Sequence, residues 1–137
     1  MRCGFLFWLA AFFAFWGCKA GDREFFKIEL SPLSVKTGES KEGEFRIIPQ
    51  AGYKWNPDFR ASAALTPPSF VEIEKKALDS KSGGISEDGG AGVVKFGYKG
   101  AGAGKGEVGA VLSFSVCNED ECKIFKGEKT GIPVEVF

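Results

Sequence analysis

The stretch EVGAVLSFSV, residues 107–116, decides the fold class of this chain. Apolar and polar residues alternate along it, so that one face carries only apolar side chains. These are Val108, Ala110, Leu112, Phe114 and Val116. A period of two residues is typical of a β-strand with one buried face. The stretch therefore predicts a strand that packs on a hydrophobic core with one side.

Other alternating or apolar stretches mark the further strands that we expect. They are residues 24–31, 43–50, 59–66, 70–78, 93–99 and 132–137. Turn-forming residues separate them at 51–58, 79–92 and 100–106. The polar, glycine-rich stretch 79–92 predicts a flexible loop. The end of 70–78 fits a helical turn as well as a strand.

Short strands about every ten to fifteen residues, with turns between them and no sustained helical period, are typical of a β-sandwich. The segment 24–137 also has the size of an immunoglobulin domain, about 100 residues. The long-range bridge between the sheets of antibody domains has no counterpart, because the cysteines of this segment are close in sequence. We predict an all-β, immunoglobulin-like antiparallel β-sandwich over residues 24–137.

The composition excludes several classes of function. The chain has 137 residues, with 18 basic and 18 acidic side chains and a formal charge of +0. This balance gives no electrostatic reason to expect a nucleic-acid partner. The chain has no histidine, which excludes Ser-His-Asp and Cys-His catalysis and most catalytic zinc sites. We expect neither a metal nor a cofactor.

The first residues have the layout of a secretory signal. Arg2 gives a short positive start, and residues 4–17 are apolar or glycine. This run is too short to span a bilayer comfortably. Residues 1–17 are therefore predicted to be an export signal rather than a folded helix.

The apolar run ends in FWGC, residues 15–18, which resembles the bacterial lipobox. In that motif a small residue precedes a cysteine that is acylated and becomes the first residue of the mature protein. Gly17 and Cys18 match the motif, whereas the two residues before them depart from it. We expect a lipid on Cys18, a tether at 18–23 and a place in the bacterial cell envelope. Ordinary cleavage near Ala20 and a retained membrane anchor are the alternatives.

The stretch VCNEDECK, residues 116–123, holds the candidate chemistry. If Cys3 leaves with the signal and Cys18 is acylated, Cys117 and Cys122 remain as two thiols in an oxidising compartment, so we expect a disulfide. A loop this short gains only about 2 kcal/mol from such a bridge, roughly half the gain of a long-range one. Both a structural hairpin clip and a redox pair fit this spacing. Two thiolates without histidine do not complete a tetrahedral metal site.

Charged residues lie between and beside the two cysteines. Glu119, Asp120 and Glu121 disfavour a thiolate by repulsion between like charges. Lys123 opposes them next to Cys122. This arrangement favours Cys122 as the better nucleophile of the pair.

Two aromatic residues of the turn-rich stretch 51–58 are further candidates. Tyr53 and Trp55 are predicted to lie near the surface, where they would form a patch for a binding partner. Packing over the edge of the sandwich is an equally good interpretation.

Two segments together resemble a known family. They are AGYKWNPDFRASAALTPP at 51–68 and GEVGAVLSFSVCNEDECKIFKGEKTGIPVEV at 106–136. Both are similar to the N-terminal periplasmic domain of the thiol:disulfide interchange protein DsbD family. The resemblance implies an immunoglobulin-like fold with protein-disulfide reductase or interchange activity. Cys117 and Cys122 match the redox pair, and Cys122 would form the mixed disulfide. Gly52 and Tyr53 match a turn beside the site.

The chain also departs from that family. The cysteines are one residue closer together than in the best-known members, and the stretch 79–92 lacks the aromatic residue of the family's shielding loop. The family's membrane domain and thioredoxin-like domain are expected to be missing. The reductant would then be another chain, a thioredoxin-like or other thiol protein of the envelope. The competing interpretation is a non-enzymatic envelope binding module in which the bridge only clips a hairpin.

Overall fold

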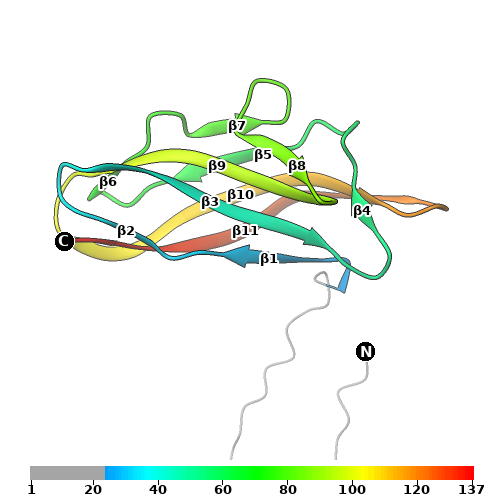
Figure 1. Ribbon diagram of the computed structural model, residues 1–137, viewed down its shortest axis with the longest axis horizontal. Coiled ribbons are helices and arrows are strands. Elements are labelled where there is room, and N and C mark those ends of the chain that lie inside the picture. The colour runs from blue at the N-terminus through cyan, green and yellow to red at the C-terminus, as the bar shows by residue number, and fades with distance from the viewer. Residues whose placement is uncertain (1–23) are drawn as a thin grey trace, which may run out of the picture.

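The structure is a computed structural model, and it describes residues 24–137. The predicted signal at 1–17, the lipid on Cys18 and the tether at 18–23 lie outside the described residues. The regular elements of the described part are all strands, arranged in two sheets that pack face to face (Figure 1). The predicted all-β sandwich is confirmed.

The first sheet has the order β1-β3-β9-β6, with β8 also paired to β9. Its strands are β1 (Phe26–Leu30), β3 (Ser40–Pro49), β6 (Val71–Glu72), β8 (Ile85–Asp88) and β9 (Ala91–Gly100). All of these pairings are antiparallel. The expected strands at 24–31, 43–50 and 93–99 are confirmed as β1, β3 and β9.

The second sheet has the order β2-β11-β10-β5-β7, with β4 also paired to β10. Its strands are β2 (Leu33–Val35), β4 (Lys54–Trp55), β5 (Ser62–Thr66), β7 (Ala77–Asp79), β10 (Gly104–Cys117) and β11 (Cys122–Val136). The pairing of β2 with β11 is parallel and departs from the predicted antiparallel arrangement. It arises because the chain crosses after β1 to the other sheet, where β2 lies beside β11 and runs in the same direction.

The core lies between the sheets and follows the predicted alternation. In β10 the side chains of Val108, Leu112 and Phe114 are fully buried. Phe114 is the centre of an aromatic cluster. The centroid of its ring lies 4.9 Å from that of Phe26, 5.3 Å from that of Phe125 and 5.7 Å from that of Trp55. Burial of such side chains is the main driving force of folding. This cluster fills the end of the core that lies nearest to the two cysteines.

The prediction of a flexible loop at 79–92 is wrong, because this stretch contains β8 and the start of β9. Gly89 and Gly90 connect the two strands, with φ angles of 60° and 84°. A two-residue hairpin turn with left-handed backbone at both positions favours glycine, which has no Cβ to clash. The glycines here form a tight turn.

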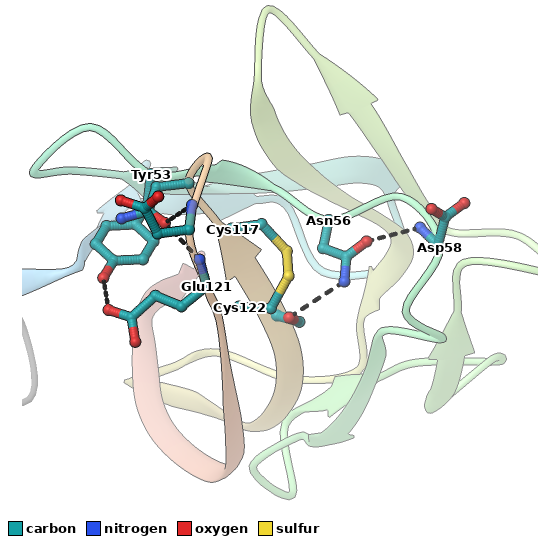
Figure 2. Close-up of a disulfide and its surroundings, with 9 residues drawn as sticks. Tyr53, Asn56, Asp58, Cys117, Glu121 and Cys122 are labelled. Atoms are coloured by element: carbon teal, nitrogen blue, oxygen red, sulfur yellow. Dashed lines mark hydrogen bonds between the residues drawn. A yellow bond between two sulfur atoms is a disulfide. The ribbon is translucent and has the colours of Figure 1, made fainter.

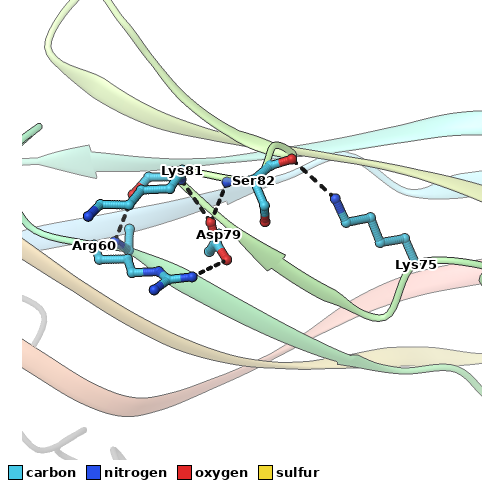
Figure 3. A network of polar contacts seen from close by, with 7 residues as sticks. Arg60, Lys75, Asp79, Lys81 and Ser82 are labelled. Atoms are coloured by element: carbon cyan, nitrogen blue, oxygen red, sulfur yellow. Dashed lines mark hydrogen bonds and ion pairs between the residues drawn. The ribbon is translucent and has the colours of Figure 1, made fainter.

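A polar network holds the chain just after β7 (Figure 3). The Asp79 carboxylate accepts hydrogen bonds from the backbone N–H groups of Lys81, at 2.8 Å, and Ser82, at 2.6 Å. The Arg60 guanidinium lies 3.1 Å from it. These contacts, the bond from Ser82 foremost, hold the pKa of Asp79 well below its usual range. The helical turn considered for the end of 70–78 is replaced by β7, which this network terminates.

The last strand is much longer than the predicted 132–137, because β11 already begins at Cys122. Its register against β10 shifts between Leu112 and Ser113, where Gly127 is the extra residue of a bulge and has a φ of 72°. Glycine commonly takes this position in a bulge. The glycine connection predicted at 100–106 is shorter, because β10 begins at Gly104.

Candidate functional site

Cys117 and Cys122 form a disulfide where β10 turns into β11 (Figure 2). The two residues are directly opposite partners in the antiparallel ladder, with Cα atoms 4.0 Å apart. The tip of this hairpin projects beyond the other strands at one end of the sandwich (Figure 1, right). The predicted disulfide is confirmed.

The loop between the cysteines is ordered by its own hydrogen bonds. The Asn118 side-chain oxygen accepts bonds from the N–H groups of Asp120, at 2.9 Å, and Glu121, at 2.8 Å. The Asn118 N–H in turn donates to the Glu121 carbonyl at 2.9 Å. An asparagine that accepts bonds from the next residues is a common turn former. The turn is therefore closed by backbone contacts in addition to the disulfide.

The two cysteines have different surroundings. Cys117 is half-buried and lies between β11 on one side and Lys54 of β4 on the other. Cys122 is exposed. Among residues 24–137, β11 has a neighbour on its other side only at Val134–Val136, where β2 pairs with it. An attacking thiol therefore has access to the Cys122 sulfur from the open edge of the sheet.

Tyr53 contacts the hairpin loop, as the resemblance implied for the turn that carries it. Ala51 and Gly52 both have left-handed backbone, with φ angles of 57° and 81°, and the Tyr53 N–H donates to the Gln50 carbonyl at 3.1 Å. This tight turn brings the Tyr53 hydroxyl to the Glu121 carboxylate, to which it donates at 2.5 Å. The bond raises the pKa of Tyr53 to about 12 and lowers the pKa of Glu121.

Lys123 lies close to the acids but on the other face of β11 from Cys122, because neighbouring side chains of a strand point to opposite faces. Its ammonium lies 3.7 Å from the Glu121 carboxylate and 4.5 Å from the centre of the Phe25 ring. The Phe25 ring packs edge-on against Tyr53, with centroids 5.3 Å apart. Lys123 therefore offsets the charge of Glu121, and its ammonium is engaged on the face away from the disulfide.

Trp55 does not form an exposed patch, so that part of the predicted partner surface is wrong. Its side chain is 5 % exposed and stacks on Phe114 with an interplanar angle of 13°. The backbone N–H of Trp55 donates to the Gly90 carbonyl at 3.1 Å. The Trp55 ring lies so close to Gly92 that a Cβ there would overlap it. Trp55 thus joins the β8–β9 hairpin to the end of the sandwich that carries the disulfide.

Sequence reasoning missed two polar residues beside the cysteines. Ser115 is 1 % exposed, and among residues 24–137 it is the one polar residue that is buried. Asn56 covers it: the Asn56 N–H donates to the Ser115 carbonyl at 2.9 Å, and the Asn56 amide nitrogen donates to the Ser115 hydroxyl at 3.3 Å. The alternation of SFSV places Ser115 on the same face as Cys117. Nothing in the sequence indicates that Asn56 covers that face.

Two classes of site are not found in the described part of the chain. Residues 24–137 contain no group of three or more acidic, cysteine or histidine side chains that could hold a metal ion. No helix among these residues has the length and apolar character needed to cross a bilayer.

A comparison with protein-family models gave no match for this chain. A comparison with curated protein sequences also gave none. The similarity to the DsbD N-terminal domain therefore rests on the two quoted segments alone.

Proposed function

We propose that this chain is an exported thiol–disulfide exchange domain that passes electrons between envelope proteins through Cys117 and Cys122. One observation carries the proposal: an exposed Cys122 is bridged to a half-buried Cys117 at the open end of the sandwich. The partners are thioredoxin-like or other thiol proteins of the envelope. A lipid on Cys18 holds the domain at a membrane.

The exchange begins with a partner thiolate that attacks the Cys122 sulfur. A mixed disulfide forms between the partner and Cys122, the Cys117–Cys122 bond breaks, and its electron pair leaves on Cys117 as a thiolate. A second thiol of the partner then attacks the partner sulfur that is bonded to Cys122, and Cys122 is released as a thiolate. The partner leaves as a disulfide, and the two cysteines take up protons to become thiols. The reverse sequence passes the two electrons to the next protein.

Three features of the hairpin favour a fold that persists when the bridge is reduced. The ladder of β10 and β11 extends over most of both strands, and the Asn118 turn closes the hairpin independently. The bridge closes a loop so short that it adds only about 2 kcal/mol. Folded domains typically have a net stability of about 5–15 kcal/mol. A carrier must remain folded in both redox states, and these magnitudes are compatible with that requirement.

The test is capture of a partner as a mixed disulfide. The Cys117→Ser variant leaves Cys122 as a free thiol without its neighbour. Its thiolate should attack the disulfide of an oxidised thioredoxin-like protein, form a mixed disulfide with one partner sulfur and release the other as a thiolate. Alkylation of that released thiolate stops it from reversing the step and traps the complex. The Cys122→Ser variant is the matched control and should trap much less, because the remaining thiol is half-buried. Non-reducing gel electrophoresis separates the two outcomes.

The competing function is a binding module in which the bridge only clips the hairpin. It would be supported if neither variant forms a mixed disulfide and if the wild-type bridge resists reduction until the domain unfolds. A reduction potential below about −300 mV, typical of structural disulfides, would also support it.

The membrane anchor has its own test. Replacement of Cys18 by Ser should release the protein from membranes, because the acylated cysteine would be lost. Membrane fractionation of the wild-type and Cys18→Ser proteins checks this. Equal distribution of the two proteins would contradict lipidation at Cys18 and would leave the exchange proposal unaffected.

A further inference from the structure

Ser115 is buried on the outer face of its sheet. The side chains of Phe114 and Val116 point into the core, so that Ser115 and Cys117 point the other way. Ser115 is nevertheless 1 % exposed, because Asn56 lies over it. A hydroxyl in such a place must find hydrogen-bond partners within the protein.

The hydrogen bonds of Asn56 leave the Ser115 hydroxyl as a hydrogen-bond donor. The Asn56 side-chain oxygen accepts a bond from the Asp58 N–H at 3.1 Å, which fixes the orientation of the amide. The amide nitrogen therefore faces Ser115 and donates to its oxygen. The Ser115 oxygen thus accepts from Asn56, and the hydroxyl hydrogen remains for a second bond in which Ser115 is the donor.

The neighbours of Ser115 on this face narrow the choice of acceptor. Ile124 lies directly opposite on β11 and offers only an apolar side chain. Ser113 and Cys117 lie two residues away on either side along β10. In the oxidised protein the Cys117 sulfur is bonded to Cys122 and is a weak acceptor. After the bridge opens, rotation about χ1 allows the freed sulfur to approach the Ser115 hydroxyl.

We propose that the Ser115 hydroxyl, oriented by Asn56, donates a hydrogen bond to the Cys117 thiolate that leaves when the disulfide opens. This inference deepens the proposed function and rests on it for its biological role. In the exchange step a partner thiolate bonds to the Cys122 sulfur, and the electron pair of the broken S–S bond goes to Cys117. Half-burial makes a bare thiolate at Cys117 costly, and the Ser115 donor offsets that cost. Cys117 thereby becomes the better leaving group.

Charged groups around Cys117 also affect its thiolate, so they must stay constant in any test. They are Lys54, Asp58, Glu119, Asp120, Glu121 and Lys123. Replacement of Ser115 by Ala removes the hydroxyl and leaves all of these charges unchanged. Ser113→Ala is the matched control, because Ser113 lies on the same face of the same strand but one step further from Cys117.

The first measurement is the titration of Cys117 as the single thiol of the full chain. Cys3, Cys18 and Cys122 are replaced by Ser, and the ultraviolet absorbance of the thiolate is followed against pH. Ser115→Ala should raise the pH of half-ionisation by about one unit, since a hydrogen bond to a charged group contributes roughly that much. Ser113→Ala should leave it unchanged, and Ser115→Thr, which keeps a hydroxyl, should restore most of the shift.

The second measurement is the rate at which dithiothreitol reduces the wild-type disulfide. Ser115→Ala should slow it about threefold or more at neutral pH, because a thiolate of higher pKa leaves more slowly. Equal thermal unfolding temperatures of the oxidised variants show that the fold is intact. If Ser115→Ala and Ser113→Ala titrate alike, the inference is wrong. If instead the wild-type bridge resists reduction in the folded domain, the exchange function fails, and the titration still decides the role of Ser115.

Discussion

Two hairpins meet at the same end of the sandwich and differ in what closes them. The β10–β11 hairpin has a four-residue acidic loop and a disulfide. The β8–β9 hairpin has only Gly89 and Gly90 in its turn and no covalent bridge. Both are regular, and Trp55 contacts both, through its backbone pairing with Val116 and its hydrogen bond to Gly90.

The β8–β9 hairpin shows that backbone pairing and aromatic packing are sufficient to order a hairpin at this end of the molecule. The β10–β11 turn is closed by the Asn118 hydrogen bonds as well as by its disulfide.

The largest effect is expected from Trp55→Ala, because this residue packs against both hairpins. Loss of a buried aromatic side chain typically costs about 3–5 kcal/mol. Trp55 is 5 % exposed and stacks on Phe114, so the free energy of unfolding should fall by an amount in that range. Urea unfolding followed by far-ultraviolet circular dichroism measures it. A loss below about 1 kcal/mol would contradict the role of Trp55 as the shared support.

A somewhat smaller effect is expected from Gly92→Ala, where the new Cβ would overlap the Trp55 ring. Overpacking in a filled core usually costs about 1–3 kcal/mol. Gly97→Ala on the same strand is the matched control, because a Cβ there meets open space. That control should be neutral or stabilising by up to about 1 kcal/mol. Similar losses in both variants would show that Gly92 is not held by Trp55.

The strands that sequence predicted well are those whose buried face is continuous. Residues 107–116 alternate without interruption because every second side chain enters the core. The stretch 122–131 was missed because charged residues occur on both of its faces, as Lys123 and Lys126 do, and because the bulge at Gly127 breaks its period. The stretch 79–92 was misinterpreted because glycines in a tight hairpin turn have the same composition as glycines in a loose loop. The turn is fixed by pairing with β9 and by Trp55, which are long-range contacts.

In the candidate site too, the features with a local sequence signal were predicted and those that depend on long-range pairing were not. The cysteine pair and the neighbourhood of Tyr53 were predicted, the first from the export signal and the second from the family resemblance. The burial of Trp55 and the cover that Asn56 places over Ser115 depend on how β4 pairs with β10. That pairing joins segments about 60 residues apart, and no local pattern in the sequence encodes it.

Removal of the bridge should have a moderate effect. The double variant Cys117→Ser, Cys122→Ser should lose about 2 kcal/mol of unfolding free energy, the value for a short closed loop. Its circular dichroism spectrum at neutral pH should match that of the wild-type protein, because the ladder and the Asn118 turn remain. Urea unfolding of the oxidised wild type and the double variant checks the difference. An unfolded double variant would make the bridge a structural requirement and would count against a reversible carrier.

The smallest effect is expected from Tyr53→Phe, which removes the hydrogen bond to Glu121 and leaves the aromatic ring. The bond and the nearby Lys123 lower the pKa of Glu121 in the folded protein. A carboxylate whose pKa is lowered on folding stabilises the protein above its unfolded pKa, and this stabilisation is lost as the pH falls through the folded value. The variant should therefore be slightly less stable than the wild type at neutral pH, and the two should converge in acid.

Nuclear magnetic resonance titration of the Glu121 side chain checks the cause directly. Its pKa should rise toward the ordinary value in Tyr53→Phe, and a smaller rise is expected in Lys123→Met, because the hydrogen bond from Tyr53 is the larger contribution. An unchanged Glu121 titration in Tyr53→Phe would mean that the bond between the two side chains is absent in solution. In that case the turn at residues 51 and 52 would be held beside the disulfide hairpin by the pairing of β4 with β10 and by the packing of Tyr53 on Phe25.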